Sequence, residues 1–79
     1  MNNLDKLHHL NEVADDLIER LKGKDGVIRF ETGEYNSQAE FTRKLLMKVL
    51  RWIDGLDQLC DGNMAAIDRD YKEVKSFNN

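Results

Sequence analysis

The sequence has few of the residues that give a small domain covalent or metal support. Its 79 residues contain no proline, five glycines and a single cysteine, Cys60. One cysteine excludes an intramolecular disulfide, and the chain has no set of four zinc ligands. A chain of this length buries only about 60–65% of the surface that its unfolded state exposes, so no large active-site cleft is expected. Association with a second copy is the support that remains, and it is our working hypothesis.

An excess of positive charge and long apolar runs are also missing. Twelve basic residues against fifteen acidic ones give a net charge of −3 and a pI near 5.3. This balance removes any general electrostatic reason to bind nucleic acid and leaves only a local patch as a candidate. No segment approaches the roughly 20 apolar residues of a membrane span or resembles a signal peptide. We therefore expect no membrane contact and a cytoplasmic location.

The periodicity of the apolar residues predicts a mainly α-helical, single domain over residues 1–79. From Leu4 to Leu21 they recur every three or four positions, which predicts an amphipathic helix over about 3–22 with Asn2 or Asn3 as its cap. A second helix begins at the capping box of Ser37 and Glu40 and extends to about residue 60. Its broad apolar side makes it the main core element. We expect four of its residues to be buried: Leu46, Val49, Ile53 and Leu56.

The connection over about 23–36 differs in composition. Val27 to Thr32 is rich in β-branched and aromatic residues, and the following glycine and acidic residue are typical of a turn. We expect a short extended or β-hairpin-like segment that pairs with itself or with a second copy, or remains a loop. Phe30 and Tyr35 in this segment either form a contact surface for a partner or small ligand, or pack onto the helices.

The end of the second helix is ambiguous. Asp61-Gly62-Asn63 is a breaker cluster, which favours a third helix and a small three-helix bundle. A spacing of seven instead favours one helix that continues to about residue 77, and we prefer this narrowly; it joins Leu46, Ile53, Cys60, Ile67 and Val74. Such a helix is on the order of 60 Å long, so its apolar stripe would need a second protomer to cover it. The continuous helix therefore predicts a helical hairpin that dimerises.

No group of residues has the spacing of a catalytic or cofactor site. His8 and His9 near Glu12 give too few ligands on one helix for a metal, and we expect them to be exposed. Cys60 lies in the apolar stripe and is expected to be a buried, inert thiol. Neighbouring carboxylates are explained by solvated helix faces, and the spacing of a phosphate-binding glycine loop is absent. We expect no enzymatic activity, no metal and no cofactor.

The most informative feature is a basic arc on the second helix, formed by Arg43, Lys44, Lys48 and Arg51. The first helix carries a possible complement, formed by Glu12, Asp15, Asp16 and Glu19. Our preferred interpretation is that the two sets pair, within one chain or across a dimer, and fix the helix register. The alternative is that the arc faces outward and holds a phosphate, an acidic protein or a nucleic-acid backbone.

These observations favour a non-enzymatic protein-interaction module that occupies a partner's surface, as an inhibitor, adaptor or assembly factor. Its expected partners are a second copy of the chain and an unidentified protein. The candidate contact residues are those of the basic arc together with Phe30 and Tyr35. The alternatives are a nucleic-acid-binding regulator that uses the basic arc, and an oligomer that sequesters a small anionic ligand.

Overall fold

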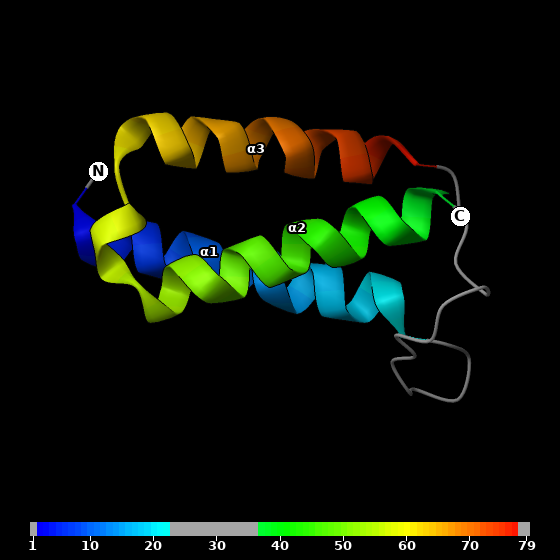
Figure 1. The fold of residues 1–79 in the computed structure, drawn as a ribbon, viewed down its shortest axis with the longest axis horizontal. Coiled ribbons are helices and arrows are strands. Elements are labelled where there is room, and N and C mark those ends of the chain that lie inside the picture. Colours follow the sequence, from blue (N-terminus) through cyan, green and yellow to red (C-terminus); the bar gives the residue numbers. More distant parts are fainter. Residues whose placement is uncertain (1, 23–36, 78–79) are drawn as a thin grey trace.

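The computed structural model describes residues 2–22 and 37–77, and this part of the chain is mainly helical. Its elements are α1 (Asn3–Leu21), α2 (Ser37–Asp54), a short 3-10 turn η1 (Leu56–Gln58) and α3 (Asp61–Ser76). As Figure 1 shows, α2 runs back along α1, and α3 runs back along α2, so α1 and α3 point in the same direction. The hairpin-like connection expected at 23–36, with Phe30 and Tyr35, lies outside the described residues.

The first helix forms as its sequence pattern predicts. The side chain of Asn2 caps it, because its Oδ1 accepts a hydrogen bond of 2.8 Å from the backbone N–H of Asp5. At the other end the backbone N–H of Lys22 donates to the carbonyl of Ile18. The apolar residues spaced by three and four positions form one stripe, of which four are buried: Leu10, Val13, Ala14 and Leu17.

The continuous second helix is wrong, because α2 ends at Asp54 and the chain turns at Gly55. Glycine costs about 1 kcal/mol more than alanine inside a helix, which makes Gly55 a weak point. Asp54 and Asp57 add negative charge at the C-terminal end of α2, where the helix dipole disfavours it. Low helix propensity and unfavourable charge therefore coincide at one position, and the helix stops there.

The cluster Asp61-Gly62-Asn63 starts α3 and does not interrupt a helix. Asp61 lies in the first turn, where the positive end of the helix dipole favours a carboxylate. The side-chain amide of Asn63 donates to the carbonyl of Gln58 at 2.8 Å and so fastens the start of α3 to the preceding turn. The break is real, but it falls at residues 55–60, several residues before the expected cluster.

The return of α3 closes a single core between the three helices. Met64, Ile67 and Val74 are buried there with relative exposures of 6%, 0% and 1%. The apolar stripe that was expected to need a second protomer is therefore covered by the chain itself. The core is completed by residues of α1 and α2 and by one residue of the turn: Leu10, Val13, Ala14, Leu17, Leu45, Leu46, Val49 and Leu59.

The turn also changes which residues of the expected stripe are buried. Leu46 and Val49 lie in the core as predicted, whereas Ile53 is only partly buried. Leu56 is 54% exposed, so its predicted burial is wrong. Cys60 is also exposed, at the N-cap position of α3, and the buried thiol is wrong for the same reason. The change of direction at Gly55 removes residues 56–60 from the face of α2, and only Leu59 of the two leucines in this turn reaches the core.

Replacing Gly62 with alanine is expected to stabilise the fold by about 0.5 kcal/mol, because it lowers the entropy cost of the first turn of α3. A Cβ atom at this position would meet no other atom within 4 Å. Gly55→Ala is the control and should be stabilised less, since its Cβ would lie 3.3 Å from Oδ1 of Asp57. Urea denaturation of both variants measures the difference. A less stable Gly62→Ala variant would contradict the position of α3.

Candidate functional site

The polar contacts between distant parts of the chain join α1 to α3. Lys6 Nζ lies 3.1 Å from Oδ1 of Asp61, although the lysine is itself 8% exposed, so its stem is covered while its ammonium reaches the surface. Hydrogen bonds from Lys6 hold the pKa of Asp61 below its usual value. A second contact follows along the same two helices, where His9 Nε2 of α1 contacts Oδ1 of Asp68 of α3. Within residues 2–22 and 37–77, the side chains of α1 that contact another helix through polar groups therefore meet α3.

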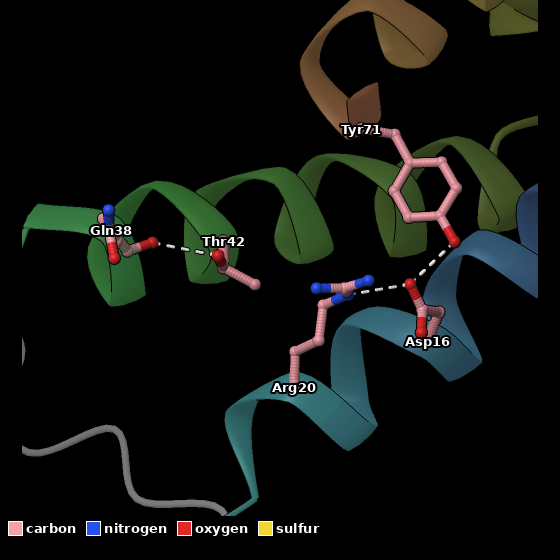
Figure 2. A network of polar contacts seen from close by, with 5 residues as sticks. All are labelled: Asp16, Arg20, Gln38, Thr42 and Tyr71. Atoms are coloured by element: carbon pink, nitrogen blue, oxygen red, sulfur yellow. Dashed lines mark hydrogen bonds and ion pairs between the residues drawn. The ribbon is translucent and has the colours of Figure 1, made fainter. Parts of the chain in front are cut away.

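The innermost of these contacts centres on the carboxylate of Asp16. Its Oδ2 accepts a hydrogen bond of 2.7 Å from the Tyr71 hydroxyl and one of 2.9 Å from Arg20 Nε (Figure 2). Partial burial raises the pKa of Asp16, but the hydrogen bonds from Tyr71 and Arg20 outweigh it and hold the pKa below its usual value. The ammonium of Lys75 lies 4.6 Å from the centre of the Tyr71 ring. This cluster fastens α3 to α1 and uses an acid that was expected to face the basic arc.

Stability at high pH should depend on Tyr71. Burial and the hydrogen bond to Asp16 raise its pKa from 10.0 to about 12. Because the folded-state pKa is the higher one, the contribution to stability is fully present below pH 10 and is lost as the pH rises towards 12. We expect a loss of about 1 kcal/mol, less than an unscreened shift would give, because the phenol is partly exposed.

Comparing the chain with Tyr71→Phe measures this contribution. The free energy of unfolding of the unmodified chain should fall more steeply between pH 10 and pH 12 than that of the variant. The two proteins differ only in the Tyr71 hydroxyl, so the difference between the two curves isolates the contribution of this group. Parallel curves would contradict the hydrogen bond to Asp16.

The basic arc of α2 does not pair with α1 in the described ranges 2–22 and 37–77. Arg43 and Lys44 lie 3.6 and 3.7 Å from Oε1 of Glu40 on their own helix. Lys48 lies 6.0 Å from the centre of the Trp52 ring, and Arg51 is exposed. The expected pairing within one chain is therefore wrong. Asp16 instead contacts Tyr71 of α3, and Glu19 contacts Lys22 just after its own helix. The pairing across a dimer remains a prediction.

These cations share one side of α2 with two exposed apolar residues. Lys44, Lys48 and Arg51 follow one another at four and three positions, so they form a stripe along the helix. Met47 and Leu50 lie beside this stripe and are 49% and 42% exposed. We call this surface the outer face of α2; it consists of Arg43, Lys44, Met47, Lys48, Leu50 and Arg51.

A small groove borders the outer face on the side of α3. It has a volume of about 160 Å³ and is lined by Phe41, Lys44, Leu45, Lys48 and Asp70. A second hollow of about 90 Å³ lies where the ends of the three helices meet, next to Arg20 and Thr42. The Thr42 hydroxyl there is satisfied by the carbonyl of Gln38 at 2.9 Å. Both hollows are smaller than the roughly 300 Å³ at which small-molecule sites begin, so each suits a side chain rather than a cofactor.

The other candidate residues stay apart from one another. His8 is exposed, and His9 contacts Asp68. In the described part of the chain no three residues among His, Cys, Asp and Glu are grouped so that they could hold a metal ion. No described helix is long and apolar enough to cross a membrane.

Two contributors to the outer face were missed by sequence reasoning. The contact residues expected from the sequence include neither Met47 nor Leu50. The signal was present, because Met47 lies three residues after Lys44 and four before Arg51, on the polar side. Comparison with family models, with curated proteins and with solved structures found no match to this chain.

Proposed function

We propose that the protein is a non-enzymatic interaction module that binds another protein through the outer face of α2. The observation that carries this proposal is a surface with four cations and two large exposed apolar residues that the described fold does not use. Arg43 and Lys44 make only loose contacts, both to Glu40, and the Lys44 side chain is 72% exposed. The surface is therefore available without any rearrangement of the helices.

The composition of the outer face supports a protein partner. Methionine and arginine are enriched in protein interfaces, and exposed apolar residues next to charged ones are typical of such surfaces. Met47 and Leu50 lie among the cations, whereas a phosphate backbone gains nothing from apolar contacts there. Glu40 and Asp54 limit the basic surface at its two ends, and the chain has a net charge of −3. A nucleic-acid partner is therefore the less favoured alternative.

Reversing two charges on this surface tests the proposal. The variant Lys44→Glu/Lys48→Glu should unfold at the same temperature as the unmodified chain, because both side chains are exposed. It should lose at least about tenfold in affinity for protein partners captured from the source lysate, since like charges would then face the partner. Arg69→Glu/Lys72→Glu on α3 is the matched control, with the same change in net charge on two other exposed residues.

Each other outcome has a distinct meaning. A folded Lys44→Glu/Lys48→Glu variant that keeps every partner contradicts the proposal. Sedimentation of both variants tests whether the partner is a second copy, and salt-dependent retention on a nucleic-acid column tests the alternative. If Lys44→Glu/Lys48→Glu unfolds, and adding Asp15→Lys/Glu19→Lys restores folding, then the basic arc pairs with α1 and not with an external partner.

A further inference from the structure

The proposed function leaves open what the outer face binds, and the groove beside it is informative. Resting on that function, we propose that the partner presents an acidic amphipathic segment whose tyrosine or tryptophan side chain enters the groove between α2 and α3. In this arrangement the carboxylates of the segment lie against Lys44 and Lys48.

The floor of the groove is apolar and held in place. Phe41 packs edge to face against Phe77 of the segment after α3, with ring centroids 5.9 Å apart and an angle of 77° between the rings. Leu45 is 3% exposed and belongs to the core. Because both residues are fixed by contacts within the chain, little conformational entropy is lost when a side chain is placed on them.

The size of the groove limits its occupant to one side chain. Its volume is about 160 Å³, below the range of small-molecule sites. A single large apolar side chain in such a recess is the usual anchor of a protein interface. The exposed Met47 and Leu50 lie across the basic stripe from the groove, so they extend the apolar contact along the same partner.

The walls of the groove determine the chemistry of the occupant. Lys44 and Lys48 on the α2 side provide two exposed positive charges, which favour carboxylates next to the anchoring side chain. Asp70 on the α3 side is 25% exposed, and its contact with Arg69 is long, at 3.8 Å. Its carboxylate can accept a hydrogen bond, which the hydroxyl of tyrosine or the indole N–H of tryptophan can donate.

Helix α1 of a second copy fits the groove less well than such a segment. The exposed acidic residues of α1, Glu12, Asp15 and Glu19, have no exposed large apolar residue among them. Leu4 is 63% exposed but lies about two turns before Glu12. A second α1 would therefore bring charge to Lys44 and Lys48 without an anchor for the groove.

Selection of peptides tests the inference without knowledge of the natural partner. A displayed library of random linear peptides is selected on the immobilised full-length chain. We expect enrichment of peptides that combine aspartate or glutamate with tryptophan or tyrosine. Their affinity should fall at least about tenfold on Lys44→Glu/Lys48→Glu. It should stay unchanged on Lys22→Glu/Lys72→Glu, which reverses two exposed charges outside the lining of the groove.

The hydrogen bond to Asp70 is measured by a double-mutant cycle. Asp70→Ala removes the acceptor, and replacing the tyrosine of a selected peptide by phenylalanine removes the donor. Each change alone should weaken binding about five- to tenfold. The two changes together should cost little more than either alone, because they remove the same contact. Additive losses would place the aromatic side chain outside the groove.

The results separate this inference from the function on which it rests. No enrichment, or enrichment of basic peptides or peptides without aromatic residues, overturns the acidic segment and leaves the outer face as an interaction surface. Selected peptides whose affinity does not change in Lys44→Glu/Lys48→Glu overturn the groove as their site. Lysate partners that the same variant retains overturn the proposed function itself.

Discussion

Replacing Ile67 with alanine is expected to lower the free energy of unfolding by about 2–5 kcal/mol. Ile67 is fully buried in the middle of α3, at 0% exposure, and lies in the core that the three helices share. Truncation removes three buried carbon atoms and leaves a cavity that the neighbours fill only in part. A chain of this size is stabilised by roughly 4–12 kcal/mol in total, so the loss is a large share. Urea denaturation followed by circular dichroism measures it.

The control for this substitution is Leu56→Ala. Leu56 is 54% exposed in the turn, so its truncation should cost less than about 1 kcal/mol. If α2 and α3 were instead one continuous helix, Ile67 would be buried only between two protomers. Its effect on stability would then depend on protein concentration. A loss of stability at Ile67 that is independent of concentration supports the return of α3 within one chain, and no loss at all contradicts it.

The helices themselves could be predicted from the sequence because their pattern is local. The buried face of α1 follows from spacings of three and four residues, which depend only on helix geometry. Its start follows from an asparagine side chain next to unpaired backbone N–H groups. Both signals need no knowledge of the rest of the chain, and both are confirmed.

The break between α2 and α3 was misplaced because periodicity does not report direction. Leu46 and Ile67 are both buried, yet they lie on two helices that run in opposite directions. Each arm of a helical hairpin needs an apolar face towards the same core, so a spacing in multiples of seven can persist across a turn. Low helix propensity at Gly55, with acidic residues around it, was the better local signal.

The basic arc could be found from the sequence, but not the direction in which it faces. Which helix pairs with the acids of α1 depends on how α3 docks, which is a long-range property. Tyr71 meets Asp16 and Asp68 meets His9 only because α3 returns along α1. From the sequence, the arc was paired with the acids of α1 on complementary charge alone, without the position of α3. The same error hid the groove, whose far wall is Asp70 of α3.

The largest effect is expected from a charge placed on the inner side of α2. Val49 is 0% exposed, and Val49→Asp would bury a carboxylate with no partner among the core residues. The cost of such a charge is several kcal/mol, in addition to the lost packing of valine. This approaches the whole stability of the chain, so we expect the variant to be largely unfolded at room temperature.

The neighbouring residue provides the control for this prediction. Lys48 is exposed on the outer face, and Lys48→Asp should leave the melting temperature within a few degrees of the unmodified chain, because its carboxylate stays in water. An aspartate at position 49 should therefore unfold the chain, whereas an aspartate at position 48 should leave it folded. If both variants fold, or both unfold, the orientation of α2 is wrong and the basic residues lose their place on an outward surface. If only Val49→Asp unfolds, any loss of partner binding in Lys48→Asp belongs to the surface and not to the fold.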